Sequence, residues 1–221
     1  MHPRRVAIAL LFLAGCAGPG PDTPAGPDLA RLAETAERMA PAAEAACRAE
    51  GTVPVCDFRV AVDTRPEVAP NAFQTLASDD RPLLIFTRAL IRDARNADEL
   101  AFIFAHEAAH HILGHIPMQQ RAARLGAAIL QREAAAGGAD IAAIRLAGRV
   151  GAEIGARSFS KEMELEADAL GTAITHAAGF DPVRGADYFD RIPEPGGGFL
   201  STHPPVAARK AVVTRVAAGL E

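Results

Sequence analysis

The sequence has no apolar stretch long enough to cross a membrane, which takes about 20 residues in a helix. The run from Val6 to Leu13 holds eight apolar residues and follows Arg4 and Arg5. A short apolar run behind a basic start is typical of a signal peptide. We therefore exclude a multi-pass membrane protein and predict that residues 1–15 are a signal peptide absent from the mature chain.

Basic clusters and internal repeats are also missing. The formal net charge is −4 at pH 7, and without residues 1–15 it becomes −6, because 21 Lys and Arg then face 27 Asp and Glu. Such an acidic chain is not expected to bind nucleic acid or to hold a membrane by charge. The lack of repeats excludes a tetratricopeptide array. Hydrophobic residues make up 49% of the chain, although Trp is absent, and they are numerous enough to form the core of a single domain. We place this domain at residues 29–221.

Only three cysteines are present, and the first has a context of its own. Cys16 ends the segment Leu13-Ala14-Gly15-Cys16, which resembles a bacterial lipobox. The motif predicts that Cys16 becomes the lipidated first residue, and Ala17 after it favours the outer over the inner membrane. The alternative is an ordinary cleavage site with an incidental cysteine. Residues 16–28, with four Pro and three Gly, are expected to form an extended tether.

Cys47 and Cys56 remain as an even pair. In an exported protein such a pair favours a disulfide. A loop this short would stabilise the fold by about 2.5 kcal/mol on the chain-entropy model. The alternative is two unrelated thiols.

A short histidine motif carries most of the chemical information. The segment His106-Glu107-Ala108-Ala109-His110 continues an apolar run that is expected to be helical. Residues four apart lie on one helix face, so His106 and His110 can direct two imidazoles at one metal ion, with Glu107 beside them as a base. A zinc hydrolase requires this set. The motif can arise by chance, but four of the seven His, at positions 106, 110, 111 and 115, fall within ten residues.

A catalytic zinc site usually has a third protein ligand. The metzincin spacing would place it shortly after His110, but Leu113 and Ile116 stand where Gly and His should be. No Cys lies near the motif, which argues against a structural zinc site. The third ligand must therefore come from elsewhere in the chain.

The acidic segment at residues 160–168 is the better source of this ligand. Glu164 and Asp168 lie four residues apart, so both can face the first helix. Glu164 would bind the metal, and Asp168 would accept the spare N–H of a ligand histidine. Periodicity alone leaves Glu162 and Glu166 open as ligands, although a solvated helix face also explains them.

The remaining pattern predicts an α+β protein that is mostly helical. Strands are expected at residues 55–63 and 82–87, where β-type residues gather. Helices are expected from residue 29, with Pro41 kinking or ending the first, and from residue 88. The motif helix should cover residues 97–115, limited by Pro117, and another should cover 161–178 and stop at Gly179.

Residues 118–157 predict two further helices, broken at Gly137-Gly138. Their apolar stripe consists of Leu125, Ile129, Ile141, Ile144, Leu146, Val150 and Ile154. We expect this stripe to pack against the core. A lid or a membrane-touching hairpin is the alternative.

Several further blocks of the chain stand in a fixed order around the histidine motif. They are Asn71-Ala72-Phe73, Asp98-Glu99-Leu100-Ala101 leading into the motif with His115 behind it, Glu164-Leu165-Glu166-Ala167-Asp168, Gly179-Phe180-Asp181-Pro182, and Ser201-Thr202-His203-Pro204-Pro205 followed by Arg209. In this order the blocks resemble the HtpX-like and CAAX-prenyl-protease-like family of zinc metalloendopeptidases, over about residues 57–215. The multi-pass members of that family have transmembrane helices, and this chain lacks them.

The resemblance implies a zincin catalytic core of the gluzincin type. A small β-sheet would carry an edge strand beside the active-site helix. The resemblance also selects Glu164 over its neighbours, so that His106, His110 and Glu164 would hold one Zn²⁺ per chain.

Further roles are implied for residues around the metal. Glu107 would be the catalytic base. His203 would donate to the oxyanion or bind zinc as a fourth ligand that keeps the enzyme latent. Asn71, Ala72 and Phe73 would form the edge strand that pairs with the backbone of an extended substrate.

Together these features predict a lipid-anchored zinc metalloendopeptidase on the periplasmic side of the bacterial outer membrane. Its expected substrates are unfolded or misassembled envelope proteins, as in protein quality control, and it would touch the membrane through its lipid anchor. The alternative is a non-proteolytic periplasmic chaperone or assembly factor that keeps the peptidase fold. The intact Glu107 argues against this alternative, because a binding protein needs no catalytic base.

Overall fold

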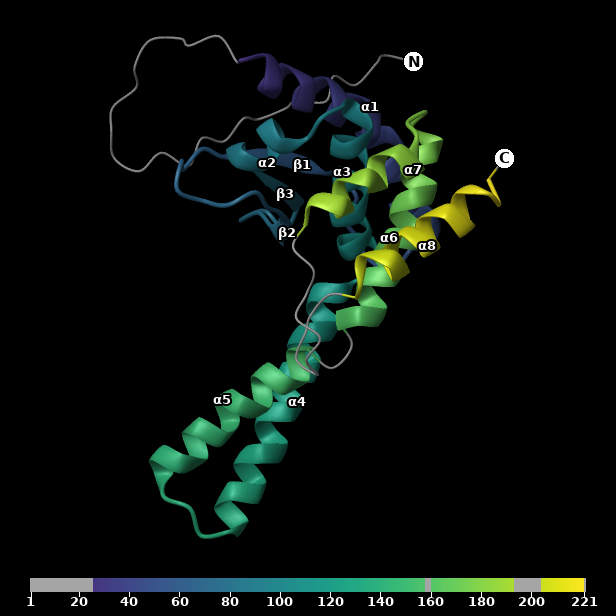
Figure 1. Ribbon diagram of the computed structural model, residues 1–221. Helices are drawn as coiled ribbons and strands as arrows, with labels where there is room; N and C mark the ends of the chain where they lie inside the picture. Colours follow the sequence, from purple (N-terminus) through teal and green to yellow (C-terminus); the bar gives the residue numbers. More distant parts are fainter. Residues whose placement is uncertain (1–25, 158–159, 193–203, 221) are drawn as a thin grey trace.

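The computed structural model describes residues 26–157, 160–192 and 204–220. The predicted signal peptide, the lipidation site Cys16, nearly all of the tether and His203 lie outside these residues. Helices predominate around one small sheet (Figure 1). The helices are α1 (Pro27–Glu50), α2 (Arg88–Asp93), α3 (Ala97–Ile112), α4 (His115–Ala136), α5 (Ile141–Arg157), α6 (Ser160–Ala177), α7 (Pro182–Gly185), the 3-10 helix η1 (Ala186–Arg191) and α8 (Val206–Ala217).

The sheet has three strands, β1 (Arg59–Asp63), β2 (Ala72–Leu76) and β3 (Pro82–Thr87), in the order β1-β3-β2. β1 pairs with β3 in parallel, and β2 pairs with β3 in antiparallel. Among the described strands β2 has no second neighbour, so its outer edge is open. α3 packs against β2 and β3. A small sheet with an edge strand beside the motif helix agrees with the expected fold class.

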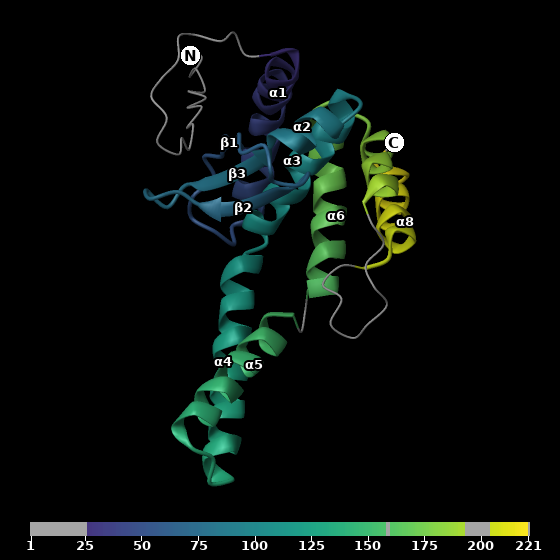
Figure 2. The same cartoon turned by 60° about the vertical axis from the view of Figure 1, so that its left-hand side comes forward.

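The core lies between α1, the sheet, α3 and α6 (Figure 2). Asn96 caps the N-terminus of α3, and its side chain accepts a hydrogen bond from the Glu99 amide at 2.9 Å. Most of α3 is buried, including Leu100, Phe104 and Ile112. The two motif histidines therefore stand on a helix of the core, where a polar side chain needs a partner.

α4 and α5 form a hairpin that projects from this body (Figures 1 and 2). The chain turns at Gly137 and Gly138, as the sequence predicts, and Gly138 has a φ of 77°. The expectation that the apolar stripe packs against the core is wrong. Its exposed members include Leu125, Ile129, Ile141, Leu146 and Val150. Small residues form the contact between α4 and α5 instead, so the large apolar side chains stay outside. No described helix is long and apolar enough to cross a membrane.

β1 begins at Arg59 and not near Val55 as predicted. The Val55 carbonyl accepts a hydrogen bond from His111 Nε2 at 2.8 Å. Cys56 is joined to Cys47 by a disulfide, with the two Cα atoms 5.7 Å apart. These links tie residues 55 and 56 to α3 and α1, which keeps them away from the ladder with β3.

Helix boundaries differ from the predicted ones at three places. α1 begins two residues earlier, at Pro27, and runs through Pro41. The motif helix ends at Ile112, because Gly114 adopts a φ of 69° and a new helix starts at His115. Pro117 falls in the first turn of α4, where its missing N–H costs no helical hydrogen bond.

Candidate active site

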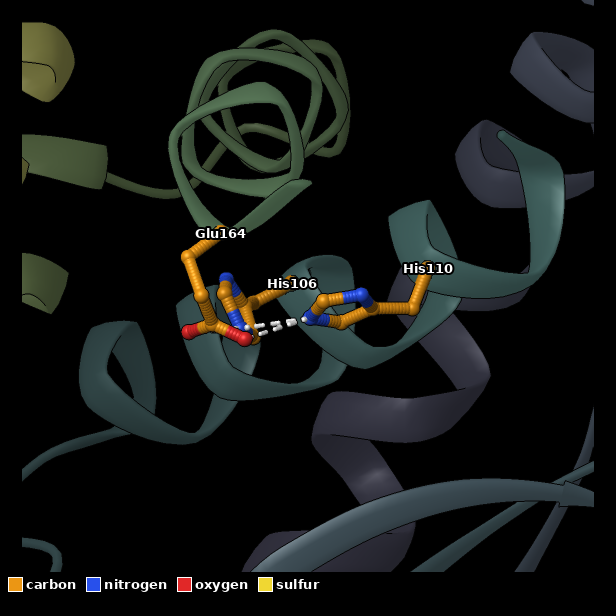
Figure 3. Close-up of side chains that lie close together, drawn as sticks. All are labelled: His106, His110 and Glu164. Atoms are coloured by element: carbon orange, nitrogen blue, oxygen red, sulfur yellow. Dashed lines mark hydrogen bonds and ion pairs between the residues drawn. The ribbon is translucent and has the colours of Figure 1, made fainter. Parts of the chain in front are cut away.

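Three side chains from two helices meet at one point (Figure 3). His106 and His110 lie one turn apart on α3, and Glu164 reaches them from the start of α6. The Nε2 atoms of the two histidines are 3.1 Å apart. Glu164 Oε2 lies 3.6 Å from His106 Nε2, and Glu164 Oε1 lies 3.3 Å from His110 Nε2. Glu162 and Glu166 are exposed, so the phase of α6 directs Glu164 to the histidines.

These separations fit a tetrahedral metal ion. Zinc binds imidazole nitrogen and carboxylate oxygen at about 2.0–2.2 Å, which sets neighbouring ligand atoms about 3.3 Å apart. The charges fit as well. The carboxylates of Glu107, Glu164 and Asp168 surround one guanidinium, that of Arg209. If all three are ionised, a divalent cation cancels the two negative charges that remain.

Behind His106, Asp168 and Arg209 form a buried ion pair. Arg209 donates from Nε to Asp168 Oδ2 at 2.7 Å and from Nη2 to Oδ1 at 2.6 Å. Asp168 Oδ1 also lies 3.0 Å from His106 Nδ1. Burial opposes ionisation of Asp168, but the hydrogen bonds from Arg209 and His106 outweigh it and hold the pKa of this carboxyl below its usual value. Asp168 thus accepts the Nδ1–H of His106, which leaves the Nε2 lone pair for a metal.

His115, the first residue of α4, orients His110 in a similar way. Their Nδ1 atoms are 2.8 Å apart, and His115 Nε2 lies 3.3 Å from Glu166 Oε2. Burial lowers the pKa of His115 to about 4, so this ring is neutral at pH 7. When His110 keeps Nε2 for a metal, its Nδ1–H donates to His115, which donates in turn from Nε2 to Glu166.

Glu107 lines a cavity of about 860 Å³ together with the three candidate ligands and Arg209. Burial raises the pKa of Glu107 above its usual value, and the nearby His106 and His110 offset this only in part. A carboxylate with a raised pKa accepts a proton more readily than an ordinary carboxylate, as a general base must. The cavity therefore combines a metal-binding triangle with a group suited to acid–base chemistry.

Comparison with known proteins decides what this site belongs to. Residues 29–217 match the model of peptidase family M48. The chain belongs to peptidase family M48. No curated protein sequence matches it. The predicted resemblance to HtpX-like zinc metallopeptidases is confirmed at the level of the family, and the protein is a metallopeptidase, a hydrolase of peptide bonds.

In this M48 peptidase the cavity reaches the start of the edge strand. Asn71 and Ala72 line it, whereas Phe73 is 39% exposed and is not part of the lining. The Thr87 amide donates to the Asn71 carbonyl, and the Asn71 amide donates to Thr87 Oγ1, both at 2.9 Å. The backbone of Asn71 therefore faces β3. Since successive residues of a strand turn their N–H and C=O to opposite sides, those of Ala72 face the open edge.

Two residues of the site have roles that the sequence analysis did not assign. Arg209 appears there only at the end of a family-like block, and 41 residues separate it from Asp168. The sequence does hold one signal for a buried Arg209. It lies one helical turn before Val212 and Val213, two apolar residues that α8 buries. Glu166, which the sequence leaves open as a ligand or as a solvated side chain, is instead the partner of His115 through its carboxylate. Pro204, which follows His203, lines the cavity.

Proposed function

We propose that this M48 peptidase is a zinc-dependent endopeptidase of the gluzincin type, held by lipid on the periplasmic side of the outer membrane. The observation that carries the proposal is the triangle of His106, His110 and Glu164, with Glu107 beside it in one cavity. Two histidines from one helix and a glutamate from a second are three ligands of the kinds found in catalytic zinc sites, which keep a further position open.

Zinc, when bound, supplies Lewis acidity that polarises the carbonyl of the scissile peptide. Glu107 takes a proton from the attacking water and passes it to the leaving amine. Asp168 holds His106, and His115 holds His110, so the ligand rings are oriented in advance. His203 remains our candidate for the donor to the oxyanion, or for a fourth ligand that keeps the enzyme latent.

The open edge of β2 suits an extended polypeptide as substrate. The backbone groups of Ala72 and, by alternation, of Gln74 point away from β3. A substrate added there as a further strand lies along the cavity that leads to His106 and Glu107. Folded proteins seldom offer a free strand, so we infer that the substrates are unfolded or misassembled envelope proteins.

Metal content and cleavage test the catalytic part of this proposal. The purified protein should contain about one zinc per chain and cleave casein, and a chelator should abolish cleavage until zinc is restored. Glu107→Gln should keep zinc and lose about 10²–10⁴-fold in cleavage rate, whereas Glu162→Gln, on the exposed face of α6, should cleave as wild type. A wild-type protein that holds unfolded chains without cutting them would instead support a chaperone.

The location has a separate test. Mass spectrometry of the membrane fraction should find Cys16 as an acylated N-terminus, and Cys16→Ser should lose the acyl chains. An unmodified N-terminus at another residue would contradict lipid anchoring and leave the catalytic proposal intact.

A further inference from the structure

The α4–α5 hairpin buries small residues between its two helices and exposes its large apolar side chains. A Cβ on Gly126 would lie 2.1 Å from the Gly151 carbonyl oxygen, and one on Gly155 would lie 2.1 Å from that of Ala122, so backbone meets backbone. In a hairpin surrounded by water, large apolar side chains usually face inward. Here they face outward, with exposed fractions of 63% for Leu125, 50% for Ile129, 53% for Leu146 and 43% for Val150. Small residues between helices and apolar side chains outside are typical of helix pairs in lipid.

Four of the exposed apolar side chains, those of Leu125, Ile129, Leu146 and Val150, lie on one face of the hairpin. At about 100° per residue, Leu125 and Ile129 stand roughly 90–130° around α4 from its contact with α5. Leu146 and Val150 stand roughly 120–170° around α5 from its contact with α4. Because the two helices are antiparallel, both rotations lead to the same side. The opposite face carries Arg124, Arg145 and Arg149.

The hairpin is a basic region in an acidic protein. Residues 115–157 contain six Arg, three acidic residues and no Lys, whereas the whole chain has a net charge of −4. Arg121 and Arg132 border the apolar face on α4, within about 60° of it. The net charge of the whole chain hides this local excess. A guanidinium binds phosphate oxygens in pairs, as on a lipid headgroup.

We propose that the α4–α5 hairpin binds an anionic lipid surface. The apolar face of Leu125, Ile129, Leu146 and Val150 lies in the boundary between headgroups and acyl chains, and the arginines meet lipid phosphates. The hairpin lies on the surface, in keeping with described helices that are too short or too polar to cross a bilayer.

The charge and position of the face favour lipid over other occupants. Two copies of the chain would have to bring two arginine-bordered faces together, which like charges oppose. The face lies along a hairpin that projects from the body, whereas the cavity is lined by residues of the body (Figure 2). The proposal depends neither on the zinc site nor on acylation of Cys16.

The absence of Trp allows a direct test. A single introduced Trp reports its own surroundings, and Cys16→Ser removes any acyl anchor. In that background, Leu125→Trp and Val150→Trp should shift their emission to the blue when phosphatidylglycerol vesicles are added. Arg145→Trp is the matched control, because it stands about 140° around α5 from Val150 and should show no shift.

Vesicle binding measures the strength of the contact. Replacing Leu125, Ile129, Leu146 and Val150 together by Ser should weaken binding of the Cys16→Ser chain at least about tenfold. Arg121→Gln and Arg132→Gln should each weaken it about fivefold on phosphatidylglycerol and little on phosphatidylcholine. Val183→Ser and Leu220→Ser, exposed to a similar degree outside the hairpin, should bind as their parent. Circular dichroism checks that every variant is folded.

Four results would overturn the proposal. One is a parent that does not bind phosphatidylglycerol vesicles, and a second is a four-Ser variant that binds them equally well. Another is a lipid-free dimer that the four-Ser change dissolves, which would identify a second copy. The last is a lipid-free loss of casein binding in the four-Ser variant, which would identify a polypeptide. A protein that binds vesicles but cleaves nothing would contradict the proposed function alone.

Discussion

The body and the hairpin of this protein use glycine for the same purpose but bury their apolar side chains in opposite ways. In the body, a Cβ on Gly171 of α6 would lie 3.1 Å from the His106 amide nitrogen, so α6 comes close to α3 at the metal-binding triangle. Around that contact, apolar side chains such as Phe104 and Ile174 fill a closed core. In the hairpin, glycines bring the backbones together and the apolar side chains face outward. The body therefore buries its apolar side chains within itself, whereas the hairpin leaves its large apolar side chains exposed.

Changes at the metal triangle should separate the two regions most strongly. Glu164→Gln removes an anionic ligand, so zinc binding and casein cleavage should both fall to background, while vesicle binding through the hairpin stays unchanged. Metal analysis, a cleavage assay and vesicle sedimentation measure the three quantities. Glu162→Gln is the matched control on the same helix. An equal loss of zinc in that control would mean that the phase of α6 is wrong.

Arg209→Ala should produce the next largest effect, in the body alone. It leaves the buried Asp168 carboxylate without its partner, and breaking a buried pair from one side costs about 3–5 kcal/mol. Urea unfolding should show this loss, and zinc affinity should fall by about 10–100-fold because His106 loses its orientation. Lys210→Ala is the control, since Lys210 pairs with Asp187 and Asp190 at the surface. Equal stability of the Arg209 variant and wild type would contradict the role of this ion pair.

Gly155→Ala should loosen the hairpin and spare the body. The new Cβ would lie 2.1 Å from a backbone oxygen of α4, and overpacking of this kind costs about 1–3 kcal/mol. Hydrogen exchange should accelerate across α4 and α5 but not in α3 or α6, and cleavage of casein should persist. The three atoms nearest to a Cβ on Gly148 all belong to the flexible side chain of Gln131, so Gly148→Ala should exchange as wild type. Parallel loss of cleavage would show that the site depends on the packing of the hairpin.

Mild acid should also destabilise the body, and this is the smallest of the expected effects. The pKa of His115 is about 4 in the folded protein and about 6.5 in an unfolded chain. The unfolded state therefore binds more protons as pH falls from 6.5 towards 4, and stability is lost across that window. The loss between pH 7.5 and 5.5 should be on the order of 1 kcal/mol for His115. Burial also lowers the pKa of His111, so its effect has the same sign.

Urea unfolding of metal-free wild type and His115→Gln at pH 7.5 and 5.5 measures this contribution. The variant should lose less stability on acidification than wild type does. The same dependence on pH in both proteins would assign the acid sensitivity to other groups.

The sequence predicts those features of the fold that arise from local signals. The apolar run before His106 predicts α3, Gly137-Gly138 predicts the turn of the hairpin, and Gly179, with a φ of 77°, predicts the end of α6. The spacing of two histidines on one helix predicts two of the three corners of the triangle. Choosing Glu164 from three glutamates took a family resemblance, because the choice depends on how α6 sits against α3.

Features that depend on distant contacts escaped the sequence analysis. The apolar stripe of residues 125–154 shows that the helices are amphipathic, but not whether the core or something else covers them. Arg209 looks like one cation among many until α8 brings it to Asp168. The strand expected from Val55 starts late, because links to α1 and α3 draw this segment away from the sheet.

The disulfide between Cys47 and Cys56 determines how mechanical tension travels through the molecule. A pull on the N-terminal end of α1 passes along the helix to Cys47 and then crosses the sulfur bridge to Cys56. The intervening residues 48–55 are bypassed and carry no load. Val55 lies in this bypassed segment, so its hydrogen bond to His111 does not carry the applied force. Tension applied to the N-terminal end of α1 therefore does not reach α3 through Val55.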